Sequence, residues 1–256
     1  MRYFFKNAVD EGYMCEPING CSVGCYYCNA FKGAKRRRMV KNRAEWLIPK
    51  SDNIDINIFE NELNQAIKDN TVSLNFIALC GLTDPFCNCE TTNIFNKCKT
   101  IIENHNYLAR TLTKSKIPDN FLKHNPKLTE IGITIDGHSL YEKHLKNNNV
   151  EMLQKLKENG FYVFISFQPL NVKTPIYKLE NILENFKFVD QIKFGILDKY
   201  RIETHERQFK KAYKLSDIIA NFCIENKISF VNTGRTFSKI NRERLIKNGI
   251  TKKILF

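Results

Sequence analysis

Three cysteines in the stretch NGCSVGCYYCNAF are the residues best suited to chemistry. Cys21, Cys25 and Cys28 are separated by three and then two residues, and Cys15 lies six residues upstream. Three thiolates this close together can hold a four-iron cluster and leave one iron open to an outside ligand. The alternative is a zinc site with Cys15 as the fourth ligand. We favour the cluster because zinc sites usually pair their cysteines as C-x2-C twice, and only one such pair occurs here.

The composition indicates where this chemistry takes place. The 256 residues include nine cysteines, 40 basic and 27 acidic residues, with a net charge of +13. No run of about 18 apolar residues would span a membrane, and the start MRYFFKNAVDEGY lacks the long apolar segment of a signal peptide. We therefore expect a cytoplasmic protein with no membrane partner and reduced cysteines. Basic residues concentrate at 32–43 and 234–253, which indicates either a nucleic-acid partner or a solvated surface.

Short apolar strands alternate with amphipathic helices along the chain, and no Gly/Ser or Pro linker divides it. This alternation predicts an α/β fold with about six to seven parallel strands, arranged as a partial or complete (β/α) barrel. The barrel is expected at 13–233, between an N-terminal extension at 1–12 and a basic tail at 234–256. Strands are expected at 12–18, 73–81, 107–114, 128–136, 161–170, 189–197 and 227–234. Helices are expected at 58–68, 91–105 with a Thr N-cap, 117–124, 150–160 closed by Gly160, 176–186 and 207–226.

The cysteine motif resembles that of the radical S-adenosylmethionine (radical SAM) superfamily. The loop GLTDPF at 81–86 resembles the TDP-containing loop of the spore photoproduct lyase-like branch, and 150–170 is similar to that branch's fourth helix and fifth strand. The likeness covers about residues 13–197 and implies a barrel of the radical SAM type. It also implies a [4Fe-4S] cluster on Cys21, Cys25 and Cys28. In such enzymes an electron from the cluster cleaves S-adenosyl-L-methionine, and the resulting 5′-deoxyadenosyl radical abstracts hydrogen from the substrate.

The same resemblance implies which residues bind S-adenosylmethionine. Thr83 and Asp84 would face the ammonium group of the cofactor, which suits a hydroxyl and a carboxylate, and the aromatic Tyr27 would lie near its adenine. The alternative for Asp84 is an ordinary Asp-Pro turn. The full set of candidate cofactor-binding residues is Tyr27, Gly81, Thr83, Asp84, Ser166 and Gln168.

The substrate is expected to be a small nucleobase-like molecule. In length and motif set the chain most resembles the queuine lyases, radical SAM lyases that convert queuine to 7-aminomethyl-7-deazaguanine in the salvage of a tRNA modification. Segment 137–149 lacks the Glu-Pro and Arg typical of the wider branch, so a typical branch substrate is not expected. Candidate substrate contacts are the carboxylates at strand ends, Glu16, Asp136 and Asp198, each of which could instead cap a turn or helix.

Other partners and functions remain open. The implied reaction needs a reducing electron donor, flavodoxin or ferredoxin. Nucleic acid is the less favoured partner; it would make the chain a radical SAM enzyme acting directly on DNA or tRNA. The second alternative is a non-catalytic, zinc-bound protein.

The remaining cysteines are expected to fall into two groups. Cys87 and Cys89 follow the TDP loop, where they would donate a hydrogen atom, hold a second metal or simply lie in the loop. Cys15 is expected to be a buried strand residue or a thiol lining a pocket. Cys98 and Cys223 lie in helical patterns and are expected in the core.

Overall fold

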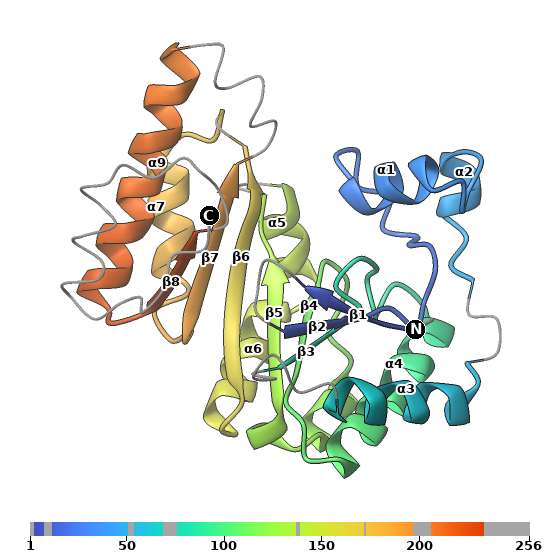
Figure 1. Ribbon diagram of the computed structural model, residues 1–256. Helices are drawn as coiled ribbons and strands as arrows, with labels where there is room; N and C mark the ends of the chain where they lie inside the picture. The colour runs from blue at the N-terminus through green and yellow to red at the C-terminus, as the bar shows by residue number, and fades with distance from the viewer. Residues whose placement is uncertain are drawn as a thin grey trace. The chain divides into compact units, whose positions relative to one another are not determined.

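The computed structural model describes residues 3–7, 12–50, 54–68, 76–136, 139–171, 173–196 and 206–232. They fall into two compact units, Met1–Ile131 and Gly132–Phe256, and each unit is described by itself. Both units combine helices with strands (Figure 1). Seven strands follow β1 in the described residues, in agreement with the six to seven expected, and the α/β class is confirmed. This succession of elements is compatible with a partial (β/α) barrel.

The strands of the first unit are β1 (Phe4–Asn7), β2 (Gly12–Cys15), β3 (Ile77–Leu79) and β4 (Ala109–Thr113). Strands β2, β3 and β4 are parallel, with Tyr13 opposite Ile77 and Ile77 opposite Ala109. Strand β1 is antiparallel to β2 and is not predicted by the sequence pattern, which assigns residues 1–12 to an extension. Residues 16–76, including the cysteine loop, form the connection between the adjacent strands β2 and β3.

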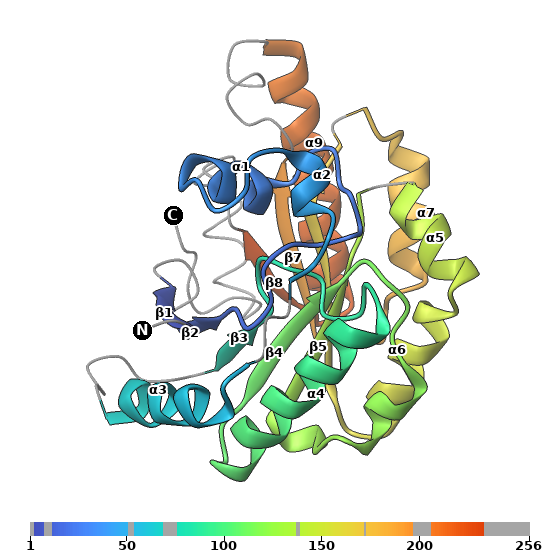
Figure 2. The same cartoon turned by 90° about the vertical axis from the view of Figure 1, so that its right-hand side faces the viewer.

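The helices of the first unit form two groups. Helices α1 (Asn29–Arg36) and α2 (Arg43–Trp46) lie side by side, close to the cysteine loop (Figures 1 and 2). Helix α3 (Ile56–Lys68) packs against β1, and α4 (Cys89–Asn104) packs against β4 (Figure 2). Two 3-10 helices follow β4, η1 (Asp119–Lys123) and η2 (Pro126–Leu128).

Helix α4 begins at a capping box. The side chain of Asn88 accepts a hydrogen bond from the Thr91 backbone N–H at 2.8 Å, and the Thr91 hydroxyl accepts one from the Asn88 N–H at 3.2 Å. These contacts satisfy two N–H groups at the start of the helix. The expected Thr N-cap is therefore wrong: the cap is Asn88, and Thr91 is the third residue of the helix.

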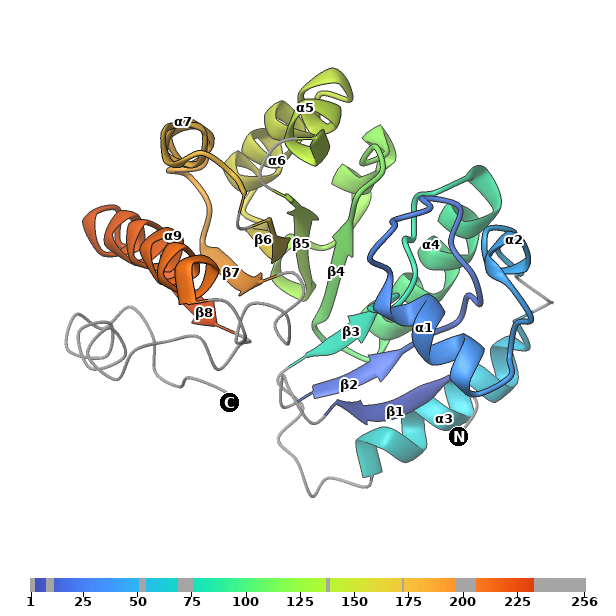
Figure 3. The ribbon, with the colours of Figure 1, turned by 90° about the horizontal axis from the view of Figure 1, so that it is seen from above.

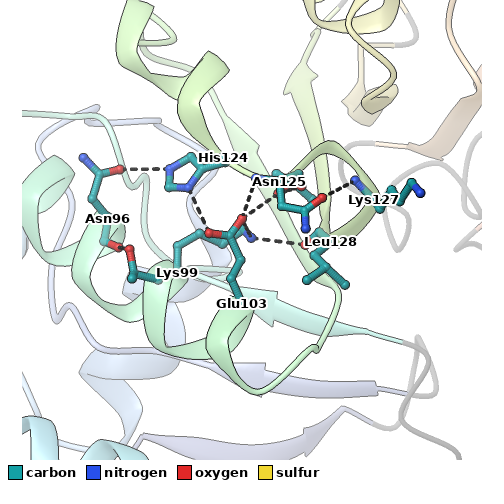
Figure 4. A network of polar contacts seen from close by, with 9 residues as sticks. Asn96, Lys99, Glu103, His124, Asn125, Lys127 and Leu128 are labelled. Atoms are coloured by element: carbon teal, nitrogen blue, oxygen red, sulfur yellow. Dashed lines mark hydrogen bonds and ion pairs between the residues drawn. The ribbon is translucent and has the colours of Figure 1, made fainter.

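A polar network is buried beneath the C-terminal half of α4 (Figure 4). The Lys99 ammonium donates to Glu103 at 2.6 Å and to the Leu128 carbonyl at 3.1 Å, and its side chain is only 1% exposed. Burial lowers the pKa of Lys99, and the nearby Glu103 opposes this shift. Glu103 also contacts His124 at 3.4 Å and accepts from the Asn125 N–H at 2.9 Å. The network thereby fixes η2 and the loop before it onto α4.

The second unit begins at Gly132, within β5 (Thr129–Thr134). After β5 it continues the alternation of helices and strands. Strands β6 (Tyr162–Leu170), β7 (Gln191–Ile196) and β8 (Ser229–Asn232) pair in that order and are parallel. The helices α5, α6, α7 and α9 lie along one side of these strands (Figure 3). Their bounds are Ser139–Lys146, Asn149–Glu158, Ile176–Glu184 and Glu206–Glu225.

Close packing shapes the core of the second unit. Phe164, Phe167, Phe194 and Phe230 are each at most 1% exposed. Gly132 lies so close to Phe164 that a Cβ atom would come within 2.6 Å of its carbonyl oxygen. Helix α6 ends at Glu158 with Asn159 as its C-cap, and Gly160 follows with φ +85°, as expected for a helix closed by glycine. In the described residues no helix is long and apolar enough to cross a membrane.

Candidate functional site

The cysteine loop begins at Cys21, six residues after the end of β2, and is fixed at both ends. The Cys21 N–H donates to the Trp46 carbonyl at 2.9 Å, and at the other end Cys28 is the N-cap of α1, where its sulfur accepts from the Phe31 N–H at 3.3 Å. Gly20 before the loop has φ +100°, and a Cβ there would lie 2.8 Å from the Trp46 carbonyl oxygen. Only glycine fits this approach without strain.

Arg43 holds the backbone in the middle of the cysteine loop. Its Nη2 atom donates to the carbonyl oxygens of both Gly24 and Cys25 at 2.6 Å. The guanidinium carbon of Arg43 also lies 5.9 Å from the centre of the Phe31 ring. Arg43 therefore orients the backbone on either side of Cys25, a role that the sequence pattern does not single out because Arg43 looks like part of a basic run.

An apolar cluster backs the loop. Its buried members are Cys21, Ala34, Val40 and Trp46, and the partly buried Val23, Cys28, Ala30 and Phe31 pack against it. Two of the three loop cysteines, Cys21 and Cys28, thus belong to this cluster or pack against it, whereas the backbone carbonyl of Cys25 is held by Arg43. Cys25 and Cys28 are both partly exposed.

A fourth thiol, Cys87, lies against Cys21. The Cys21 thiol hydrogen-bonds to the Cys87 sulfur. This contact raises the pKa of Cys21, and burial adds to that shift. The same contact lowers the pKa of Cys87, and there burial opposes the shift. The Ser22 hydroxyl donates to the Cys87 carbonyl at 3.4 Å, which links the cysteine loop to the segment after the TDP loop. The C-x-C pattern indicates Cys87 and Cys89 together, but Cys89 is exposed at the start of α4.

The three loop thiols fit an iron–sulfur cluster in type and number. The N–H donated to Cys28 is the kind of hydrogen bond that tunes such ligands. Within the described part of the chain, however, no three His, Cys, Asp or Glu side chains form a group compact enough to hold a metal ion. A cluster would therefore have to draw the three sulfurs together.

Glu16 joins the end of β2 to the TDP loop. One carboxylate oxygen accepts from the Leu82 N–H at 2.6 Å and the other from the Thr83 hydroxyl at 3.4 Å. A Cβ on Gly81 would lie 3.3 Å from Oε1 of the same carboxylate, which is a tight contact. Burial raises the pKa of Glu16 to about 8, although the residue keeps some contact with solvent. Near neutral pH this carboxyl is therefore mostly protonated and uncharged, and it acts as a hydrogen-bonding link between β2 and the TDP loop.

Asp84 joins the TDP loop to the end of β4. Its carboxylate accepts from the Phe86 N–H at 3.0 Å, the Thr113 hydroxyl at 2.9 Å and the Lys114 N–H at 2.6 Å. Asp84 is only 6% exposed and Thr83 only 5%. The carboxylate therefore satisfies donors of its own chain and fixes the relative position of the loops after β3 and β4.

Tyr27 connects the cysteine loop to the residue that follows β4, Lys114. The Lys114 ammonium lies 5.8 Å from the centre of the Tyr27 ring, and Tyr26 meets Tyr27 edge-on at 4.9 Å. Through Tyr27, Cys87 and Glu16, the ends of β2, β3 and β4 in the first unit are connected. The candidate residues of the first unit therefore lie together where its parallel strands end.

The other candidate residues lie in the second unit. On β6, Ser166 is fully buried, and its hydroxyl donates to Gln168 at 3.1 Å. Asp136, after β5, accepts from the Leu140 N–H at 2.9 Å and so supports the first turn of α5. Asp198 lies outside the described residues, as does the basic tail at 234–256.

Four further cysteines are inert. Cys15, Cys80, Cys98 and Cys223 are each at most 1% exposed, and burial raises the pKa of each thiol. The core positions expected for Cys98 and Cys223 are confirmed, and Cys15 is a buried strand residue.

Comparison of the chain with protein-family models, with curated proteins and with solved structures finds no match.

Proposed function

We propose that the chain is a radical SAM enzyme in which Cys21, Cys25 and Cys28 hold a [4Fe-4S] cluster. The observation that carries this proposal is the C-x3-C-x2-C loop, which follows a strand of a parallel set and is joined to the ends of the next two strands. When bound, the cluster would supply the electron for reductive cleavage of S-adenosylmethionine.

The chain's own residues would position the reactants. Arg43 orients the loop backbone around Cys25, and Glu16 and Asp84 hold the TDP loop beside it. Tyr27 offers an aromatic face for the adenine of the cofactor. Gly81 and Thr83 are part of the TDP loop itself. The assignment of Ser166 and Gln168 to the cofactor remains a prediction from the sequence.

We propose further that the substrate is a small nucleobase-like molecule, with queuine as the first compound to test. The support is the overall resemblance to queuine lyases. Glu16 and Asp136 remain candidate substrate contacts, but each already accepts a hydrogen bond from its own chain. Substrate contact would compete with these bonds, because a carboxylate oxygen has few free acceptor directions.

The test starts with the metal. Protein purified without oxygen should be brown and contain about four irons and four sulfides per chain. Cys25→Ala should lose the iron and 5′-deoxyadenosine formation with dithionite, whereas the control Cys89→Ala should keep both, because Cys89 is exposed on α4. A colourless protein with one bound zinc would contradict the proposal and favour the zinc alternative, for which Cys87 offers a fourth thiol beside Cys21.

The substrate is tested by mass spectrometry. Incubation with queuine, S-adenosylmethionine and dithionite should release 7-aminomethyl-7-deazaguanine. A chain shortened after residue 236 should retain this activity, because the proposed site lies before the basic tail. If only intact DNA or tRNA supports substrate-dependent turnover, and changes to Lys and Arg in the tail abolish it, the nucleic-acid alternative takes its place.

A further inference from the structure

A cluster of positive charge follows the last loop cysteine. Between residues 17 and 50 the chain has eight basic residues and one acidic residue, Glu45. Glu45 is already paired with Lys50 at 3.1 Å. Six of the basic residues are exposed on α1 and the segment after it, and we name them the α1 cation surface: Lys32, Lys35, Arg36, Arg37, Arg38 and Lys41.

The α1 cation surface is close to the cysteine loop because α1 begins directly after the last loop cysteine. Cys28 is the N-cap of α1, which is eight residues long. A helix of that length extends about 12 Å. Every cation on α1 is therefore within about that distance, along the helix axis, of a proposed cluster ligand.

Exposed apolar side chains occur in the same stretch of the chain as these charges. Met39, inside the basic run, is 49% exposed, Ile48 is 66% exposed, and Tyr26, in the cysteine loop, is 68% exposed. Methionine, tyrosine and arginine are residue types enriched at protein interfaces. Tyr26 can stack on a base, but Met39 and Ile48 cannot, so a surface that only follows a phosphate backbone gains little from two of these three side chains. The composition thus favours a protein partner of opposite charge.

We propose that the α1 cation surface is the docking site for an acidic, low-potential one-electron carrier protein. This inference rests on the proposed function: reductive cleavage consumes one electron per event, which the carrier would deliver while passing from its reduced to its oxidised form. Negative groups around the carrier's redox centre would be attracted to the cations, and the exposed apolar side chains would desolvate the contact. Such attraction accelerates encounter and weakens as salt is added.

The experiment compares two variants of equal charge. The test variant is Lys32→Gln/Lys35→Gln/Arg36→Gln. The control variant, Lys97→Gln/Lys123→Gln/Lys127→Gln, removes three exposed charges elsewhere in the first unit. The probe is a purified acidic flavodoxin, and its binding to each full-length protein is measured by calorimetry at low ionic strength and at about 0.15 M salt, where charges are screened beyond about 8 Å.

The test variant should bind flavodoxin about tenfold more weakly at low salt, and the difference should shrink at higher salt. The control variant should bind like the wild type. With dithionite, a small reductant that needs no docking site, S-adenosylmethionine cleavage should be equal in all three proteins. With reduced flavodoxin, only the test variant should be slow.

Two results would overturn the inference. One is equal flavodoxin binding by the test variant and the wild type. The other is a loss of single-stranded RNA binding in the test variant while flavodoxin-driven turnover is unchanged, which would assign the surface to nucleic acid. Absence of dithionite-driven cleavage in all three proteins would instead refute the proposed function, and the binding comparison would still decide the docking question.

Discussion

The carboxyl of Glu16 allows the contact between β2 and the TDP loop to be tested by pH. It accepts from the Leu82 N–H and the Thr83 hydroxyl, and burial raises its pKa from 4.5 to about 8. Between these two values the folded chain binds more protons at Glu16 than the unfolded chain does. The contribution of Glu16 to stability is therefore complete below about pH 4.5 and is lost as the pH rises through about 8.

The size of the effect follows from the shift. At 1.36 kcal/mol per pKa unit, the full shift corresponds to an upper limit of about 5 kcal/mol. Roughly half of this falls between about pH 6 and about pH 9. Because Glu16 keeps some contact with solvent, screening reduces the effect further. We expect the wild type to lose about 1–2 kcal/mol relative to a neutral variant over this interval.

The neutral variant is Glu16→Gln, whose amide oxygen can still accept from the Leu82 N–H. Urea unfolding, followed by far-UV circular dichroism under reducing conditions, should find Glu16→Gln gaining stability relative to the wild type as the pH is raised. Other titrating groups are common to both proteins and cancel in the difference. The control Glu151→Gln, at an exposed position on α6, should show no such trend. A difference between Glu16→Gln and the wild type that is the same at both pH values would refute the reasoning.

Three further substitutions test the packing inside each unit, and the measurement is the free energy of unfolding. Lys99→Met should destabilise the chain by about 3 kcal/mol, because it leaves Glu103 without its cation in a largely buried network. Gly132→Ala should cost about 1–3 kcal/mol or more, because the added carbon meets the ring and carbonyl of Phe164. Gly20→Ala should cost about 1–2 kcal/mol from the positive φ alone, and it should also weaken iron incorporation by displacing the cysteine loop.

Matched controls make the same residue change at positions that lack the buried contact or the close approach. Lys97→Met, at an exposed position on the same helix as Lys99, should change stability by less than about 0.5 kcal/mol. Gly33→Ala, in the middle of α1 with room for the added carbon, should be neutral or stabilising by about 0.5–1 kcal/mol. A large loss from either control, or an unchanged Lys99→Met, would contradict the packing argument.

Local patterns predict much of the fold. Helical spacing of apolar residues predicts 58–68 as a helix, and the structure has α3 at Ile56–Lys68. The signal is strong because its buried positions, Phe59, Leu63 and Ala66, recur at intervals of three and four. Strand β1 is not predicted, since its four residues form a strand only by pairing with β2. That pairing is a tertiary contact and leaves no local periodicity.

In the candidate site, too, local motifs are predicted from the sequence and tertiary contacts are not. The three loop cysteines are evident from their spacing, and the TDP loop from its motif. The contact between Cys21 and Cys87 and the bonds from Arg43 to Gly24 and Cys25 join residues 18 to 66 positions apart. No spacing rule of a helix or strand predicts such pairs, because they depend on how the connection from β2 to β3 folds back.

Trp46 gives the protein an optical reporter of its own. It is the only tryptophan in the chain, it is 4% exposed, and its carbonyl accepts the hydrogen bond from Cys21. Indole emission depends on the immediate surroundings of the ring, so all tryptophan fluorescence in this molecule comes from the apolar cluster behind the cysteine loop. Binding of a metal at the loop, or its loss to a chelator, can therefore be followed without a label. The second unit contains no tryptophan and would contribute none of this signal.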